Sequence, residues 1–351
     1  METLLFNSEK YERLYNCSFY DVNSLPIENR RHRFWGLFFL FLYSVCFFLY
    51  IVCMIAMLTM EQRKQASYQI MILLGVIHCI GLQTSGLFAG IWTFQGTVFC
   101  SSGSSTINYV VGCLAVSSWC ASTMTSQILG LNRCFVLFNR NVADLVFGGW
   151  RLIFWLSLPL LYMTYMFGFT VPPVFTSILM SYLYDPHFYY FTDQTATYKN
   201  VSHIVNNLFV CLTESGIYGT LIVLYIRATR SESTEIRTAV IRDKRIYIQV
   251  LLVGFIHFIA SLTYVLIQFF PAFQTEYVIV MASTFYLLSQ GTPPLIYIFV
   301  NRTLRNQILH GCKITKAVVS RSTVSITPLK ISSTQESSGR NRLPPIPSQN
   351  V

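Results

Sequence analysis

The most restrictive feature of the sequence is the stretch from Gln65 to Asn132, which contains no Asp, Glu, Lys or Arg in 68 residues. One helix crosses a hydrocarbon layer of about 30 Å with about 20 residues, so this stretch is long enough for two crossings. Glycines, serines and a cysteine gather between Gly90 and Thr106, which is the composition of a loop. The stretch therefore predicts two membrane-spanning helices joined by a loop, and the second helix ends at Arg133.

The composition of the whole chain agrees with a polytopic membrane protein. Of its 351 residues 53% are hydrophobic and only 11% are charged, whereas soluble domains carry about 25% charged residues. The net charge of +10 does not indicate nucleic acid as a partner, because the basic residues flank apolar segments without interleaved aromatic side chains for base stacking. Membrane lipid and cytosolic proteins are the partners that we expect for these charges.

Apolar segments recur along the chain, and each is long enough to cross a membrane as a helix. They predict an all-α membrane protein, a seven-transmembrane helical bundle. The predicted spans are residues 34–60, 66–91, 107–132, 152–171, 203–226, 246–270 and 277–300. Small residues along the third span predict close contact with neighbouring helices; they are Gly112, Ala115, Ser118, Ser122 and Thr125.

Polar segments flank these spans. Residues 1–33 form an N-terminal tail with no apolar signal-peptide segment. Residues 301–311 place apolar and basic side chains on opposite faces of a helix, which predicts a short amphipathic helix on the inner leaflet. Cys312 follows as a candidate for palmitoylation. Residues 313–351 are rich in Ser and Thr and poor in large apolar side chains, so we expect a disordered cytosolic tail.

The distribution of basic residues predicts the orientation, because cytosolic loops carry an excess of Lys and Arg. The loops after the first, third and fifth spans and the C-terminal tail hold 19 of these residues, and the other side holds 6. We therefore expect a multi-pass protein of the cell membrane with its N-terminus outside, although Arg30, Arg31 and Arg33 precede the first span. On this topology Asn16, in the sequence Asn16-Cys-Ser, is an N-glycosylation acceptor.

Most of the ten cysteines fall inside predicted spans, where a thiol is simply a small buried apolar group. Cys17 and Cys100 are the two that lie clearly on the oxidising side. We predict that they form a disulfide between the N-terminal tail and the loop after the second span; two free or separately paired thiols are the alternative.

Three short motifs resemble those of a known family. They are Tyr15-Asn-Cys-Ser18, Leu131-Asn-Arg-Cys134 and Pro293-Pro-Leu-Ile-Tyr-Ile-Phe-Val-Asn301. Together with the seven spans they resemble the nematode serpentine chemoreceptors of class T (Srt), which are G-protein-coupled receptors. The resemblance covers roughly Lys10 to Lys316 and leaves out the tail.

This resemblance implies a chemosensory receptor that binds a small-molecule ligand from outside and activates a heterotrimeric G protein. It implies no enzymatic activity and no cofactor, possible contacts of arrestin and a kinase with the Ser/Thr-rich tail, and a location in the cilium of a sensory neuron. The implied G-protein contacts are Arg133, Arg242, Lys244 and Arg245, and the implied switch residues are Pro294 and Tyr297. Arg133 also has a simpler interpretation, as a basic residue that flanks a span on the inner side.

The chain departs from the rhodopsin-like pattern at several points. No acid precedes Arg133, since Asn132 stands there, and Pro293 replaces the usual Asn. The sixth span has no proline, so a kink in it is not assured. The loop from Val174 to Ser202 has no cysteine, which removes the usual disulfide to the third span. These departures concern how the receptor switches between its states, and they do not change the class of protein that the chain resembles.

Glu214 is the only formally charged residue within the seven predicted spans, and ionisable groups at membrane depth usually face an interior or a cavity. It lies about half-way along the fifth span, as His257 does along the sixth. We expect the two to face each other, either as a structural pair or as part of a ligand site. Ser261, Tyr264 and Gln268 continue from His257 at helical spacing toward the outer end and complete the candidate ligand site.

Other functional classes fit the sequence less well. A membrane transporter, the alternative that we keep, would commonly show repeated halves and interrupted helices. An opsin would need a lysine in the seventh span, and none lies between Tyr277 and Val300. An intramembrane enzyme would carry a metalloprotease, serine-hydrolase or phosphate-loop motif, and the sequence has none of these.

Overall fold

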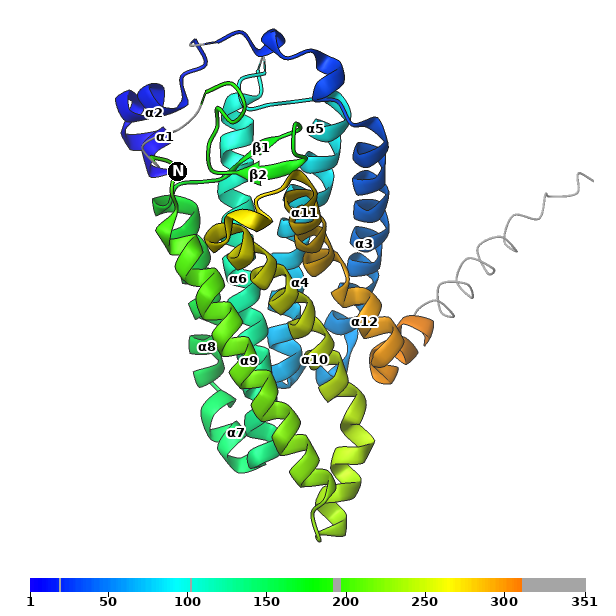
Figure 1. Cartoon of the computed structure of the whole chain (residues 1–351). Coiled ribbons are helices and arrows are strands. Elements are labelled where there is room, and N and C mark those ends of the chain that lie inside the picture. The colour runs from blue at the N-terminus through cyan, green and yellow to red at the C-terminus, as the bar shows by residue number, and fades with distance from the viewer. Residues whose placement is uncertain (19, 102, 192–196, 311–351) are drawn as a thin grey trace, which may run out of the picture. The chain divides into compact units, whose positions relative to one another are not determined.

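The computed structural model describes the chain apart from residues 19, 102, 192–196 and 311–351, and apart from the side chains of Ile236, Ala239 and Arg242. Within the compact unit Met1–Leu309, long helices lie alongside one another and a two-stranded sheet covers one end of them (Figure 1). Cys312 and the predicted disordered tail lie outside the described residues, as does the side chain of Arg242.

Six helices of the described part are long and apolar enough to cross a membrane. The second of these continues through a π-helical turn, η4 (Gln83–Phe88), into α5 (Ala89–Gln95). The six are α3 (Arg33–Thr59), α4 with its continuation (Ala66–Gln95), α6 (Ser105–Phe138), α8 (Arg151–Phe169), α9 (Val201–Thr229) and α10 (Thr234–Phe269).

The seventh span is divided into α11 (Glu276–Gly291) and α12 (Pro293–Val300), each too short to cross alone. Pro293 and Pro294 explain the division, because proline has no N–H to donate to the preceding turn and fits best in the first turn of a helix. The two helices follow each other closely, so that together they cover the length of the predicted span.

The outside of the bundle is as apolar as its interior. Phe48 and Leu212, for example, are 66% and 74% exposed. The central helix is α6, because 78% of its most apolar window is buried against 17% in α8. A bundle with apolar side chains on its outer surface is suited to a lipid environment, where exposed hydrocarbon carries no penalty.

Several boundaries differ from those expected from the sequence. The third span continues to Phe138, and α10 already begins at Thr234, because charged side chains extend a helix beyond the hydrocarbon layer without cost. The segment between the third and fourth spans contains a helix, α7 (Arg140–Phe147). Its first turn is capped by Asn139, whose side chain accepts hydrogen bonds from the N–H groups of Asn141 and Val142.

Residues 302–310 form the expected short helix. Asn301 caps it by accepting a hydrogen bond from the N–H of Leu304 at 3.1 Å. The apolar face is held against the bundle, because Leu304 is fully buried and Ile308 packs against the same core cluster. Arg305 folds back to donate to the carbonyl groups of Ile298 and Phe299 at the end of α12.

The N-terminal segment is folded rather than extended. It contains α1 (Glu2–Phe6), α2 (Ser8–Tyr15) and two 3₁₀ turns, η1 (Val22–Ser24) and η2 (Ile27–Asn29). Tyr15, at the end of α2, is buried against Phe99 of the loop before α6 and Tyr109 in the first turns of α6. Desolvation in this cluster raises the pKa of the Tyr15 hydroxyl well above its usual range. These contacts place the segment at the same end of the bundle as the sheet (Figure 1).

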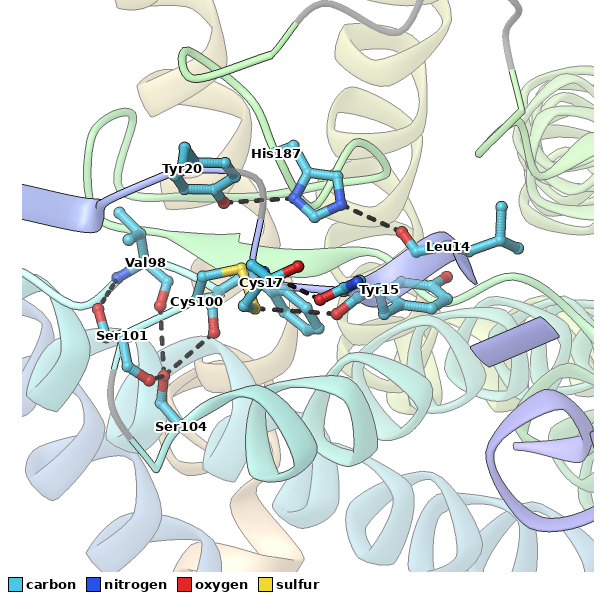
Figure 2. The surroundings of a disulfide bond; sticks show 12 residues. Leu14, Tyr15, Cys17, Tyr20, Val98, Cys100, Ser101, Ser104 and His187 are labelled. Atoms are coloured by element: carbon cyan, nitrogen blue, oxygen red, sulfur yellow. Dashed lines mark hydrogen bonds between the residues drawn. A yellow bond between two sulfur atoms is a disulfide. The ribbon is translucent and has the colours of Figure 1, made fainter. Parts of the chain in front are cut away.

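A disulfide between Cys17 and Cys100, the pair predicted from the sequence, joins this segment to the loop before α6, with the Cα atoms 5.4 Å apart. Figure 2 shows a second connection beside it, through His187 of the loop after α8. The ring of His187 lies between the Tyr20 hydroxyl, 3.3 Å from Nδ1, and the Leu14 carbonyl oxygen, 3.1 Å from Nε2. The disulfide thus lies where three segments meet at the end of the bundle that carries the sheet.

Removal of the disulfide should loosen the contact between these segments. The bond closes a sequence separation of 83 residues, and the chain-entropy model assigns about 4.5 kcal/mol to a loop of this size. We expect Cys17→Ser and Cys100→Ser each to lower the apparent melting temperature of the purified protein by several degrees, and the double variant to lower it no further. Cys211→Ser, which changes a free thiol in α9, is the control. An additive double variant would show that the two cysteines act separately.

Candidate functional site

A β-hairpin forms the roof of the candidate site. Strands β1 (Val174–Thr176) and β2 (Ser181–Leu183) pair antiparallel, with Phe175 opposite Tyr182. The side-chain amide of Asn108 on α6 holds β1 as a second strand would, since it donates to the Phe175 carbonyl at 2.9 Å and accepts from the Phe175 N–H at 2.7 Å. The hairpin is therefore fixed to the central helix.

The hairpin can approach α6 because Gly112 has no side chain. A Cβ atom at this position would lie 1.8 Å from the carbonyl oxygen of Pro173. Tyr182 fixes the other strand by donating from its hydroxyl to the Thr84 carbonyl in the π-helical turn at 2.8 Å. The loop after the fourth span thus folds back over the bundle, as its aromatic composition favours.

Beneath the hairpin lies a cavity of about 160 Å³ between α6, α9, α10 and α11. Its walls combine aromatic rings with a few neutral polar groups, and none of the lining residues carries a carboxylate, an ammonium or a guanidinium group. The side chains used below are Trp119, Tyr184, His203, Asn207, Tyr264 and Tyr286.

Aromatic rings surround Trp119 at the bottom of this cavity. Its ring centroid lies 6.2 Å from that of Tyr264 and 5.8 Å from that of Tyr286, the latter in an edge-to-face arrangement. His203 extends the group, because its ring lies 6.0 Å from Tyr264 and 5.7 Å from Tyr184 of the roof. Burial raises the pKa of the Tyr184 hydroxyl well above its usual range, so this part of the roof remains neutral.

Asn207 on α9 orders the polar side of the cavity. Its Oδ1 accepts from the indole N–H of Trp119 at 2.9 Å, which fixes the orientation of the amide, and its Nδ2 lies 3.2 Å from Nε2 of His203. Nδ2 therefore donates to His203, whose Nε2 accepts and whose Nδ1 carries the proton. A polar ligand group can replace one partner in these hydrogen bonds while Asn207 and His203 both remain neutral.

Tyr286 connects the cavity with three helices. Its hydroxyl donates to the Ala115 carbonyl on α6 at 3.0 Å and lies 3.0 Å from the Thr84 hydroxyl. Since Tyr286 belongs to α11, a ligand that displaces its ring acts on the packing of the seventh span against α6.

The residues predicted as a ligand site are only partly brought together. Tyr264 and Gln268 line the cavity. Ser261 is buried one turn below Tyr264, and its hydroxyl has no hydrogen-bond partner among the described residues.

The prediction that Glu214 and His257 face each other was wrong. Both nitrogen atoms of His257 have other partners, the Val253 carbonyl at 3.0 Å and Nε2 of His78 at 3.3 Å. Glu214 is fully buried, but both of its carboxyl oxygens lack a hydrogen-bond partner among the described residues. It lines a separate cleft between α9 and α10, on the buried face of α9 that also carries Tyr218.

His257 instead belongs to a buried hydrogen-bonded chain. The Val253 carbonyl can only accept, so Nδ1 of His257 carries its proton and Nε2 accepts. His78 on α4 must then donate from Nε2, and its Nδ1 accepts from the Tyr50 hydroxyl of α3 at 2.6 Å. The chain joins α3, α4 and α10 just below Trp119, whose ring lies 6.0 Å from His257. His78 is the central member of this chain.

At the opposite end of the bundle, Arg133 is 8% exposed and its Nε has no hydrogen-bond partner among the described residues. The groups that interact with it electrostatically are Tyr247 and Asp243 on α10 and Tyr68 on α4. Of the other basic residues predicted for this face, Lys244 is exposed and Arg245 half-buried.

The two predicted switch residues, Pro294 and Tyr297, are buried in α12. The Pro294 carbonyl accepts a hydrogen bond from the Cys53 thiol at 3.8 Å. Tyr297 is fully buried, and its hydroxyl has no hydrogen-bond partner within the described part of the chain. A buried, unpaired hydroxyl costs free energy, so a rotation that brings the Tyr297 hydroxyl to a hydrogen-bond partner is favourable.

Comparison with known proteins identifies the family. A family model described as serpentine type 7TM GPCR chemoreceptor Srt matches residues 1–321. The chain belongs to this Srt family. Serpentine receptor class T-55 of Caenorhabditis elegans is 23% identical to it over 262 residues, which cover 75% of this chain and 69% of that receptor. A crystal structure of squid rhodopsin matches with a TM-score of 0.60 at 15% identity, covering 83% of this chain and 87% of that one, which shows a rhodopsin-like fold.

Sequence reasoning missed several residues of the Srt receptor's cavity, among them Trp119, His203, Asn207 and Tyr286. Each lies on a predicted span, but a polar or aromatic side chain on a single turn has no periodic signal of its own. Asn207 could have been noticed as part of Asn206-Asn207, because paired amides near the end of an apolar span need partners.

Proposed function

We propose that this Srt receptor binds a small, uncharged organic ligand in the cavity beneath the hairpin and activates a heterotrimeric G protein. The observation that supports the ligand class is the cavity lining, which is aromatic, contains neutral hydrogen-bonding groups and has no formal charge. Such a lining favours a molecule with an apolar body and one or two neutral polar groups. The fold and the family agree with a receptor, and they do not favour the transporter alternative.

The proposed path to the G protein leads through the seventh span and the inner end of α10. A ligand that binds one packing of Trp119 and Tyr286 better than another shifts the population toward it. We propose that this shift moves α10 away from Arg133, which then contacts the G protein together with Lys244, Arg245 and Arg242. A kinase and arrestin are the proposed partners of the Ser/Thr-rich tail, and a sensory cilium is the proposed location.

The ligand site can be tested in cells that express the receptor with a promiscuous G protein and a calcium reporter. A panel of neutral volatile compounds should contain agonists, and Trp119→Phe should raise the half-maximal concentration of an agonist about tenfold, because Asn207 then loses its buried donor. Trp155→Phe is the matched control, since the Trp155 indole N–H donates to the Val146 carbonyl at the inner end of the bundle. Equal responses of the two variants at equal surface levels would contradict the site.

Arg133→Ala should separate ligand binding from signalling. We expect the calcium response to fall to background, while surface expression and the agonist-induced rise in melting temperature remain, because Arg133 lies at the opposite end of α6 from the cavity. Arg63→Ala, which changes an exposed arginine on the same side of the bundle, should leave all three unchanged. Loss of surface expression in Arg133→Ala would assign this residue to folding or topology.

We propose that the N-terminus lies outside, and glycosylation can test this. Asn16 is half-buried beside the disulfide, with its Oδ1 accepting from the Ser18 N–H. The second outer acceptor sequence begins at Asn200, whose side chain is buried and bonded to the His203 N–H and the Val171 carbonyl. We expect glycosidase treatment to shift the gel mobility of the wild type and of Asn200→Gln, but not that of Asn16→Gln. No shift in any of them would argue against an outer N-terminus.

A further inference from the structure

The cleft that contains Glu214 is separate from the cavity beneath the hairpin. It has a volume of about 460 Å³ and lies between α9 and α10. Its rim points outward, because Phe255 and Ile222 are 59% and 45% exposed. In a membrane this surface faces the hydrocarbon tails, so a molecule that enters the cleft comes from the lipid phase.

Close packing on one side gives the cleft its floor. Tyr218 on α9 crosses α10 at Gly254, where a Cβ atom would lie 2.0 Å from the tyrosine ring. The Tyr218 hydroxyl is held by the Ser126 hydroxyl of α6 at 3.0 Å. Glu214 lies one turn from Tyr218 on the same helix and lines the cleft with it. The packing of Tyr218 thus fixes the position of Glu214 on α9, but the carboxyl group of Glu214 takes no part in that packing.

The state of this carboxyl group follows from its surroundings. Glu214 is fully buried, and neither oxygen has a partner among the described residues. An isolated carboxylate in an apolar medium is so unfavourable that the group takes up a proton. A neutral carboxyl group then offers one donor and one acceptor, and neither has a partner in the described part of the chain.

We propose that Glu214 forms a second binding site, entered from the bilayer, for a lipophilic alcohol. A hydroxyl group both donates and accepts, so it satisfies both functions of the neutral carboxyl group, whereas a ketone or ether only accepts. Glu214 lies near the middle of α9 (Val201–Thr229), at a depth where lipid headgroups do not reach. The rest of the ligand lies on the apolar rim formed by Leu251, Leu252 and Phe255.

Photolabelling with a matched pair of probes tests this site. The receptor, held as a single copy in lipid nanodiscs, is irradiated with a diazirine-bearing octanol or with the corresponding octane, and labelled peptides are quantified by mass spectrometry. We expect the octanol to label peptides of the α9–α10 cleft about fivefold more than the octane, the factor that corresponds to one ordinary hydrogen bond. The octane should label the outer surface without preference.

Variants of Glu214 separate the hydrogen bond from simple partitioning. Glu214→Leu should bring the ratio of the two probes to about one, whereas Glu214→Gln should keep a preference for the octanol because an amide also donates and accepts. Thr164→Val is the matched control, since it removes an exposed hydroxyl on α8 that is bonded to the Leu160 carbonyl; its ratio should equal that of the wild type. The melting temperature of Glu214→Leu should not fall, because no partner within the protein is lost.

Several outcomes would overturn the proposal. These are equal labelling by the two probes in the wild type, an unchanged ratio in Glu214→Leu, or a clear fall in the melting temperature of that variant, which would reveal an internal partner. Weaker labelling in nanodiscs that hold two copies would assign the carboxyl group to contact with a second chain. None of these results bears on the cavity beneath the hairpin, so the proposed receptor function is tested independently.

Discussion

The close approach of neighbouring segments to α6 is the constraint on which the rest of the structure depends. Gly112 admits the backbone at Pro173, and Ala115 offers its carbonyl to the hydroxyl of Tyr286. Ser118 and Ser122 are also small, and their hydroxyls donate back to the carbonyl groups of Ala115 and Trp119 in the preceding turn. Small hydroxyl side chains therefore allow close packing without leaving polar atoms unpaired in a medium that cannot solvate them.

The hairpin, the cavity and the seventh span all contact α6. Trp119 is the point of contact, since its ring touches both Tyr286 of α11 and His257 of α10. The chain from Tyr50 through His78 to His257 ties α10 to α3 and α4. Each of its two histidines has one donor and one acceptor role assigned by its neighbours, so a shift of His257 breaks a bond that only the same arrangement can restore. Such an all-or-none contact suits a two-state element.

Hydrophobicity along the chain predicts which residues lie in the membrane and at what depth, but not the direction in which each side chain points. The spans follow from runs of uncharged residues that are hydrophobic on all sides. The Cys17–Cys100 pair follows from excluding the cysteines that fall inside predicted spans or on the predicted cytosolic side. Glu214 shows the limit. Its depth in α9 was evident, but a helix turns by about 100° per residue, and a span that is apolar all round gives no indication of which side faces the bundle. The hairpin was likewise beyond the sequence, because Asn108 reaches a strand that lies far along the chain.

The C-terminal end of α6 shows how this chain accommodates a buried guanidinium without the acid that usually precedes it. Asn132 cannot neutralise Arg133, and the nearby hydroxyl groups belong to Tyr68 and Tyr247. Tyrosine hydroxyls supply dipoles rather than a full charge, so they stabilise a buried cation less than a carboxylate does. Asp243 contributes the opposite charge from α10, a helix that projects beyond most of the bundle at this end (Figure 1). The groups that act electrostatically on this arginine therefore lie on two other helices, α4 and α10, and not beside it in the sequence.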